Sequence, residues 1–169
     1  MWDPGFPSAE NSPAVLRGYH RRFSVFSNGS YGRPESPGLA LGLHPGGSCR
    51  ARALRVGPSQ AYETIAYLDR RESAYLRRQV VITFDDGTPQ EATTYVINPE
   101  HPRFAGDLLD QEIAHFILTG SGSKGTSLAY LEKTVRELES QGVQRGSMHT
   151  LLKNVREFGR DASLLPEPT

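Results

Sequence analysis

The sequence has few of the features that mark several classes of protein. Its 169 residues contain a single cysteine, Cys49, which excludes an internal disulfide and a zinc site built from CxxC pairs. No run of 18 apolar residues occurs, which argues against a membrane span. Residues 1–30 lack a basic-then-apolar signal pattern, so we do not expect secretion. The formal net charge is zero, which argues against a general nucleic-acid binder.

Other spacings are missing too. The five histidines show no HxxxH or HExxH pattern, so the sequence predicts no metal site.

Lysine is absent from residues 1–80, where 11 arginines and 6 acidic residues give a net charge of +5. A net charge of −5 over residues 81–169 balances it. Because arginine binds carboxylates bidentately, a small anionic ligand held by the first half is one interpretation. From charge alone, a solvated basic face is the favoured interpretation.

The length predicts one domain over residues 1–162, followed by a frayed tail over residues 163–169. Glycine and proline are concentrated in residues 1–58, which predicts short strands and loops. The expected strands are Leu39–Leu43 and Cys49–Val56, joined by a hairpin at Pro45-Gly46-Gly47. A helix opening at Pro58 precedes two further strands, Gln79–Phe84 and Glu91–Ile97, joined by a turn at Asp85-Asp86-Gly87.

The last third is predicted to be helical. One apolar stripe starts at Ile113 and ends at Gly120, and a second runs from Leu128 to Leu138 behind a cap at Thr126 or Ser127. A third stripe follows Ser147. Strands first and helices last, with one helix inserted, indicate the α+β class.

Residues 120–125 match a GxGxxG pattern, which is typical of dinucleotide-binding loops. A helix rather than a strand precedes the pattern, and no βαβ unit surrounds it, so we reject nucleotide binding. We expect a flexible connection between helices instead, and the alternative is that this connection lines a pocket.

The segment Tyr67–Glu72 is more informative. Glu72 ends the helix that opens at Pro58, where the helix dipole disfavours a carboxylate. A half-buried carboxylate at such a place has a raised pKa, which suits proton transfer. From composition alone, a charged surface pair is the favoured interpretation of the segment.

An ordered set of short motifs extends over nearly the whole chain. It comprises Trp2-Asp3-Pro4-Gly5-Phe6, Arg17–Phe23, Pro34-Glu35, Pro37-Gly38-Leu39, Gly46–Arg50, Tyr67-Leu68-Asp69 with Arg71-Glu72 and Tyr75, Tyr95-Val96, and the region from Gly122 to Leu131. In this order and spacing, the chain resembles the ChaC-like, glutathione-specific γ-glutamylcyclotransferases.

The resemblance implies a γ-glutamylcyclotransferase-like fold, a small, partly closed mixed β-barrel with helices packed outside. It also implies cleavage of glutathione to 5-oxoproline and cysteinylglycine without a cofactor, by a cytoplasmic monomer or weak homodimer. Glu72 corresponds to the family's general acid/base. Gly32, Arg33 and Tyr130 are then expected to bind the substrate.

The chain also departs from the family pattern. In relatives, a first strand and a Tyr-Gly-Ser-Leu substrate loop directly precede the residues matching Met1-Trp2-Asp3-Pro4, so we expect both to be missing, through a late start codon or a truncation. The family's Arg-Gly-Thr-Pro-Glu reads Tyr31-Gly32-Arg33-Pro34-Glu35, which displaces a basic group. Two alternatives therefore remain: a non-catalytic binding or regulatory protein on the same fold, and an enzyme for another γ-glutamyl amine or amino acid.

Overall fold

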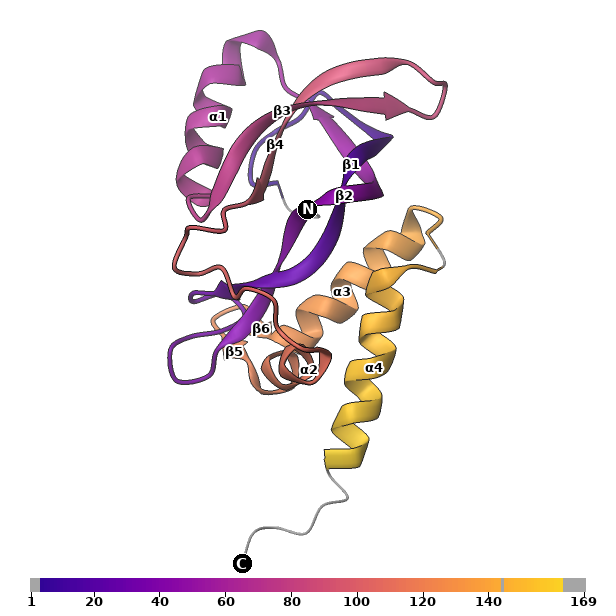
Figure 1. The fold of residues 1–169 in the computed structure, drawn as a ribbon. Coiled ribbons are helices and arrows are strands. Elements are labelled where there is room, and N and C mark those ends of the chain that lie inside the picture. The colour runs from indigo at the N-terminus through magenta and orange to yellow at the C-terminus, as the bar shows by residue number, and fades with distance from the viewer. Residues whose placement is uncertain (1–3, 144, 163–169) are drawn as a thin grey trace, which may run out of the picture. The chain divides into compact units, whose positions relative to one another are not determined.

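The four long strands precede three of the four helices along the chain, as expected for the α+β class. The computed structural model describes residues 4–143 and 145–162 (Figure 1). The elements in this part are β1 (Glu10–Ser27), β2 (Gly38–Arg55), α1 (Pro58–Arg71), β3 (Tyr75–Phe84), β4 (Pro89–Ile97), α2 (Asp110–Thr119), β5 (Ser121–Gly122), β6 (Gly125–Thr126), α3 (Ser127–Ser140) and α4 (Ser147–Ala162). The α+β prediction is confirmed, and the predicted tail at 163–169 lies outside the described residues.

The four long strands form one sheet in the order β2-β1-β3-β4, in which β1 and β3 and likewise β3 and β4 are antiparallel. Among the described residues, β2 and β4 are therefore edges, and the sheet is open rather than closed into a barrel. The β3–β4 turn at Asp85-Asp86-Gly87 is confirmed. Gly87 has a φ of 87°, and its N–H donates to the Phe84 carbonyl oxygen at 3.0 Å.

The two strands at the start of the chain differ most from the prediction. Instead of short strands, β1 and β2 are each 18 residues long. The predicted hairpin at Pro45-Gly46-Gly47 is wrong, because these residues lie inside β2. Gly46 and Gly47 have φ values of 98° and 71°, a conformation that glycine adopts without ending a strand. The Gly46 carbonyl oxygen also lies 3.1 Å from Nδ1 of His20, so β2 stays tied to β1 at this point.

The chain forms two compact units, and β1 and β2 pass from one to the other (Figure 1). The sheet unit contains the described residues up to His20 together with Leu43–His101. The helical unit contains Arg21–Gly42 and the described residues from Pro102 onward. The single domain expected over residues 1–162 stays a prediction.

The buried positions of β1 change parity between the two units. Ala14 and Leu16 are buried with Ile82 in the core of the sheet unit, whereas Phe23 and Val25 are buried in the helical unit. Gly18, with a φ of 81°, lies between the two pairs. Since side chains alternate along a strand, a local change in backbone conformation is needed to bury even positions first and odd positions later.

The helical unit has the larger apolar core. Eleven buried residues form one cluster from β1, β2 and the three C-terminal helices, with Leu39, Ile117, Leu131 and Val155 fully buried among them. Each predicted apolar stripe of the last third is thus confirmed as a helix. The predicted cap of α3 is also confirmed, because the Thr126 side chain accepts a hydrogen bond from the Ala129 N–H at 3.1 Å.

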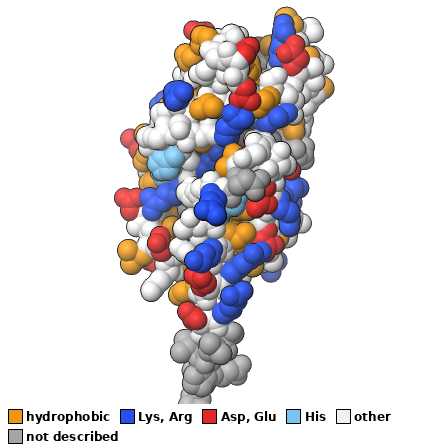
Figure 2. All heavy atoms as spheres, turned by 90° about the vertical axis from the view of Figure 1, so that its right-hand side faces the viewer, with side chains coloured by type: hydrophobic (Ala, Val, Ile, Leu, Met, Phe, Trp, Pro, Cys, Tyr) orange, Lys and Arg blue, Asp and Glu red, His pale blue; other side chains and the backbone are white. Residues whose placement is uncertain are grey.

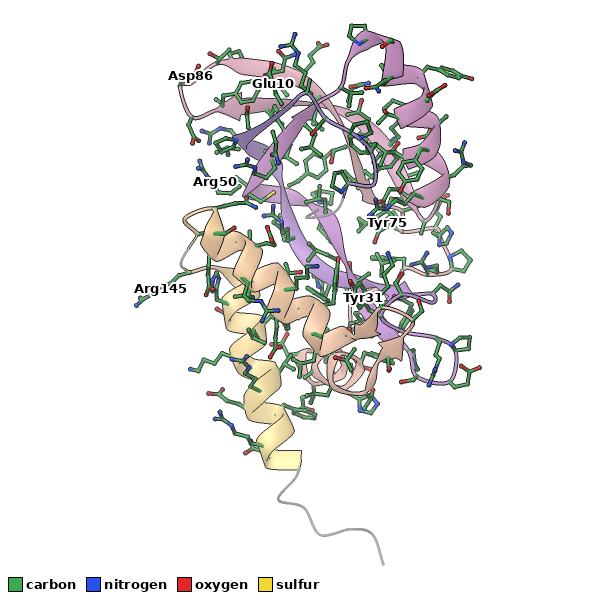
Figure 3. The ribbon with its side chains drawn as sticks, turned by 180° about the vertical axis from the view of Figure 1, so that it is seen from behind. Glu10, Tyr31, Arg50, Tyr75, Asp86 and Arg145 are labelled. Carbon is green, nitrogen blue, oxygen red and sulfur yellow. The ribbon has the colours of Figure 1, made fainter. Side chains whose placement is uncertain are left out.

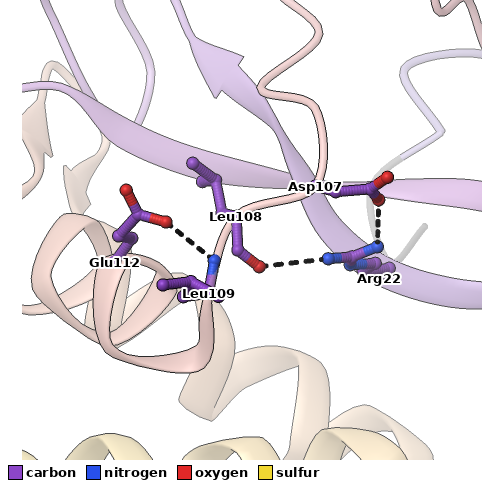
Figure 4. Close-up of polar contacts among 5 residues, drawn as sticks. All are labelled: Arg22, Asp107, Leu108, Leu109 and Glu112. Atoms are coloured by element: carbon purple, nitrogen blue, oxygen red, sulfur yellow. Dashed lines mark hydrogen bonds and ion pairs between the residues drawn. The ribbon is translucent and has the colours of Figure 1, made fainter.

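Three hydrogen bonds fix the start of α2 (Figure 4). Arg22 of β1 donates to the Asp107 carboxylate at 3.0 Å and to the Leu108 carbonyl oxygen at 3.3 Å. Glu112 accepts from the Leu109 N–H at 2.8 Å, which satisfies a backbone donor at the helix N-terminus. The segment that leads into α2 is therefore held by Arg22 of β1 and by Glu112 in the first turn of α2.

Candidate functional site

Glu72 lies at the junction of α1 and β3, in the sheet unit. It is the C-cap of α1, and its N–H donates to the Leu68 carbonyl oxygen at 2.7 Å. Its own carbonyl oxygen accepts from the Tyr75 N–H at 2.8 Å, which fixes the start of β3. The side chain is 15% exposed, and Nε of Arg71 lies 3.4 Å from its Oε1. The predicted end of the helix at Glu72 is confirmed, and the carboxylate is half-buried.

The residues before β1 cover the last turn of α1. Arg71 donates to the Pro4 carbonyl oxygen at 2.7 Å and lies 3.5 Å from the Tyr67 hydroxyl. Gly5 has a φ of 75°, and a Cβ there would collide with the Tyr67 hydroxyl. Arg71 thus joins this segment to Glu72, and only glycine fits against Tyr67.

A second carboxylate lies one turn earlier in α1. Asp69 accepts from the Tyr95 hydroxyl and from Arg77, both at 2.7 Å. Burial, together with the hydrogen bond and charge of Asp69, raises the pKa of Tyr95 well above its ordinary value, and the charge of Glu72 raises it further. The Tyr95 hydroxyl therefore stays protonated and remains a donor over the whole range in which carboxylates and histidines titrate.

An aromatic stack lies in the helical unit. The rings of Tyr31, labelled in Figure 3, and Tyr130 of α3 are stacked with centroids 4.5 Å apart. Tyr130 also meets Phe23 edge-to-face at 5.5 Å. The Tyr31 N–H donates to Oγ of Ser27 at 2.9 Å, which holds the loop between β1 and β2. The predicted site residue Tyr130 is therefore positioned by Tyr31, the residue that stands where the family pattern has arginine.

Gly32 and Arg33 follow in the same loop. Gly32 is buried, and a Cβ there would collide with the backbone of Gly38 at the start of β2. Arg33 exchanges backbone hydrogen bonds with Ser36 at 3.1 and 3.0 Å. Its side chain is 60% exposed and lies at a long ion-pair distance, 3.9 Å, from Glu35. The loop is thus fixed by its backbone, while the Arg33 guanidinium extends into solvent.

Residues 120–125 form the β5–β6 hairpin rather than a flexible connection or a phosphate-binding loop. The N–H groups of Ser123 and Lys124 each donate at 2.7 Å, to the carbonyl oxygens of Gly29 and Ser30. A Cβ at Gly120 would collide with Gly38, and one at Gly122 would lie 2.6 Å from the Gly29 carbonyl oxygen. Close backbone contacts therefore explain Gly120 and Gly122, and a φ of 117° explains Gly125.

A cavity of about 400 Å³ lies elsewhere in the helical unit, along α3 and α4. Val135 and Leu152 give it apolar walls, and Glu139, Lys153 and Arg156 add charge. Figure 2 shows basic and acidic side chains interspersed over the face that carries these helices. None of the predicted site residues lines this cavity.

Two further findings concern the described part only. Over residues 4–143 and 145–162, no three His, Cys, Asp or Glu side chains lie close enough together to hold a metal ion. In the same residues, no helix is both long and apolar enough to cross a membrane.

The four predicted site residues divide between the two units. Gly32, Arg33 and Tyr130 belong to the helical unit, and Glu72 belongs to the sheet unit. Sequence reasoning assigned no role to Tyr95 or Arg77, which contact Asp69. Tyr95 is 26 residues from Asp69, and only the pairing of β3 with β4 places it beside Arg77, so no local pattern could reveal this contact.

Comparison with known proteins gives a consistent result. A family model described as ChaC-like protein matches residues 1–158. The glutathione-specific gamma-glutamylcyclotransferase of Escherichia coli is 30% identical over 161 residues, which are 94% of this chain and 70% of that protein. Glutathione-specific gamma-glutamylcyclotransferase 1 of Danio rerio is 32% identical over 139 residues, 78% of this chain and 70% of that protein.

A solved structure supports the fold. The crystal structure of a yeast gamma-glutamylcyclotransferase specific to glutathione covers 93% of this chain and 94% of its own, with a TM-score of 0.80 and 19% identity. At that identity the likeness concerns the fold alone.

Proposed function

The chain belongs to the ChaC-like family, and on that premise we propose that it is a γ-glutamylcyclotransferase that cleaves glutathione to 5-oxoproline and cysteinylglycine. The α-amine of the γ-glutamyl group attacks its own γ-carbonyl carbon. One C–N bond forms and closes the five-membered ring, and the C–N bond to the cysteinyl nitrogen breaks. The ammonium group loses two protons, one before the attack and one as the ring closes, and the cysteinyl nitrogen gains two and leaves as an ammonium group, so the step needs neither water nor a cofactor.

Glu72 is the proposed general acid/base. The observation that carries the proposal is its placement: a half-buried carboxylate fixed by backbone hydrogen bonds on both sides, in the segment where the family has its acid/base. A single carboxylate can take the proton from the ammonium and return it to the leaving amine. Because the attack is intramolecular, holding the substrate in a folded conformation supplies much of the remaining rate enhancement.

The substrate contacts are proposed for Gly32, Arg33 and Tyr130. The Arg33 side chain is exposed, and its ion pair with Glu35 is long, so a carboxylate at the peptide end of glutathione can replace Glu35 as its partner. The stacked ring of Tyr130 provides a rigid wall with a hydroxyl group. Gly32 sets the loop backbone that places Arg33.

We also propose that the protein works in the cytoplasm, as a monomer or weak homodimer with no partner other than its small substrate. A single cysteine, Cys49, which forms no disulfide, suits a reducing compartment.

The test is release of 5-oxoproline from glutathione by the wild-type protein and by Glu72→Gln. The amide has the same shape but cannot accept and return the proton, so we expect kcat to fall by about 10²- to 10⁴-fold. Glu63→Gln is the matched control, because Glu63 is an exposed glutamate of the same helix. Thermal unfolding of each variant shows whether the fold is kept.

Three outcomes contradict parts of the proposal. Unchanged turnover in Glu72→Gln removes the role of Glu72. Calorimetric binding of glutathione by the wild type without release of 5-oxoproline favours a binding or regulatory protein. Faster turnover of γ-glutamyl-alanine than of glutathione contradicts the substrate assignment.

A further inference from the structure

The Asp69 carboxylate joins α1 to two strands at once. Tyr95 and Arg77 are directly opposed partners in the β3–β4 ladder. One donates to Oδ1 of Asp69 and the other to Oδ2, both at 2.7 Å. Both oxygens are therefore occupied from the sheet side, and one of the two donors is charged. Such a pair of bonds fixes direction as well as distance, so the last turn of α1 is held in one orientation against the hairpin.

Glu72 follows directly on this fixed turn. Its N–H donates to the Leu68 carbonyl oxygen, which ties it to α1. Its own carbonyl oxygen accepts from the N–H of Tyr75, the first residue of β3. A shift of α1 relative to β3 would therefore move Glu72. The charge of Glu72 also acts on the Tyr95 hydroxyl, so the two side chains belong to one electrostatic environment.

We propose that Asp69 and Tyr95 are positioning residues for Glu72, in that their hydrogen bond sets the place and orientation of the carboxylate that moves the proton. The role rests on the proposed function. Neither residue exchanges a proton with the substrate. Tyr95 supplies a neutral donor on β4, Asp69 supplies the acceptor on α1, and Arg77 holds the second oxygen of Asp69 so that the first stays directed at Tyr95.

The charges around Glu72 predict different effects on catalysis for the loss of Asp69 and the loss of Tyr95. Glu72 has Arg71 beside it on α1, and its charge acts on the Tyr95 hydroxyl of β4. Tyr95 and Arg77 both bond to Asp69. Removal of the Asp69 charge takes away the acidic partner of Arg77, and the added positive potential makes proton uptake by Glu72 less favourable. Removal of the Tyr95 hydroxyl changes no charge. The first change should affect both the rate and its pH dependence, and the second should affect the rate alone.

The experiment measures kcat, KM for glutathione and the pH profile of kcat in full-length wild type, Tyr95→Phe and Asp69→Asn. For Tyr95→Phe we expect kcat to fall about tenfold or more, because small displacements of a catalytic group are costly. KM for glutathione and the acid limb of the pH profile of kcat should stay as in the wild type. For Asp69→Asn we expect a similar fall in kcat, and an acid limb that moves to lower pH by roughly half a unit.

Asp85→Asn is the matched control. Asp85 accepts two hydrogen bonds from Arg50, at 2.6 and 3.2 Å, so it makes a comparable paired contact in the same unit. The contact lies at the other end of the hairpin, near Asp86 (Figure 3), and does not involve α1. A purely structural loss should lower the unfolding temperature of this variant while its kcat and pH profile stay unchanged.

The outcomes separate the two proposals. If the wild type does not cyclise glutathione, or if Glu72→Gln is fully active, the proposed function fails. If the wild type is active and Glu72→Gln is not, but Tyr95→Phe and Asp69→Asn keep the wild-type kcat and acid limb, only the positioning role is overturned. If Asp69→Asn does not fold, Tyr95→Phe decides, since it removes one hydroxyl and no charge.

Discussion

The sheet unit and the helical unit are stabilised in different ways. The sheet unit contains a cluster of only three buried residues, Ala14, Leu16 and Ile82, besides the buried Ala74, Val96 and Ile97. Paired charges such as Arg50–Asp85 and Arg77–Asp69 lie in the same unit. The helical unit has eleven buried residues in one cluster, together with glycines in close backbone contact. Apolar packing is dense and intolerant of change in volume, whereas exposed ion pairs contribute little each.

The same contrast applies to the proposed site residues. In the sheet unit, Glu72 is positioned by side-chain and backbone hydrogen bonds at the end of a helix. In the helical unit, Gly32 and Tyr130 are positioned by backbone packing and ring stacking. The proposed proton-transfer group is thus held by directional polar contacts, and the proposed substrate residues are held by close packing.

The largest difference is expected in the apolar cores. Leu131 is fully buried in the cluster of the helical unit, so Leu131→Ala should cost about 4 kcal/mol of the free energy of unfolding. Leu16→Ala in the sheet unit should cost about 2 kcal/mol, because half-buried neighbours can close part of the cavity. Urea unfolding measures both values, and equal costs would contradict the contrast between the units.

Close backbone contact in the helical unit predicts the next effect. A Cβ at Gly38 would collide with the Tyr31 carbonyl oxygen and with the Ser127 side chain. Gly38→Ala should therefore cost about 2 to 3 kcal/mol in urea unfolding. Gly57→Ala is the control, since its new methyl meets only Oε1 of Gln60 at 3.9 Å, and a cost below about 1 kcal/mol is expected from weaker N-capping. A Gly38→Ala variant as stable as this control would show that the contact can relax.

The cap of α3 gives a smaller effect. Thr126→Ala removes the acceptor for the Ala129 N–H and should cost about 1 kcal/mol. Ser140→Ala tests the other end of α3, where the hydroxyl only donates to the Glu137 carbonyl oxygen on an exposed surface. That variant should stay within about 0.5 kcal/mol of the wild type in thermal unfolding. Similar losses in both would contradict the assigned cap.

The smallest effect is confined to alkaline solution and to the sheet unit. Burial, followed by the Asp69 hydrogen bond, raises the pKa of Tyr95 in the folded protein above its ordinary value near 10. The folded state then retains a proton that the unfolded chain releases, so stability is lost as pH rises above about 10. Urea unfolding at pH 9 and 11 should show a smaller loss for Tyr95→Phe than for wild type, with the exposed Tyr62→Phe behaving as wild type.

Local patterns predicted the helices and the β3–β4 hairpin well. Each helix follows from apolar spacing within a dozen residues, and the turn follows from Asp86-Gly87, so no distant partner is needed. The sequence of β1 hides its strand, because the buried positions change parity around Gly18. Two consecutive glycines in β2 likewise resemble a turn, and only pairing with β1 keeps the strand continuous.

The candidate site, like the fold, was predictable from the sequence only in part. Glu72 was predicted because its segment is contiguous, and its position at the end of α1 is confirmed. The acid/base and substrate-binding roles stay predictions. The contacts of Tyr31 with Tyr130, and of Tyr95 with Asp69, depend on pairings between distant parts of the chain, which one sequence does not reveal.

The course of β1 and β2 has a consequence for synthesis of the chain. Neither unit is continuous in sequence: the chain enters the helical unit at Arg21, returns to the sheet unit at Leu43 and leaves it again after His101. A ribosome adds about 5 to 20 residues per second, so Phe23 and Leu39 emerge several seconds before the helices that bury them. During that interval an apolar stretch of nascent chain is without its native cover, which makes it a natural binding site for chaperones and the stage at which folding competes with aggregation.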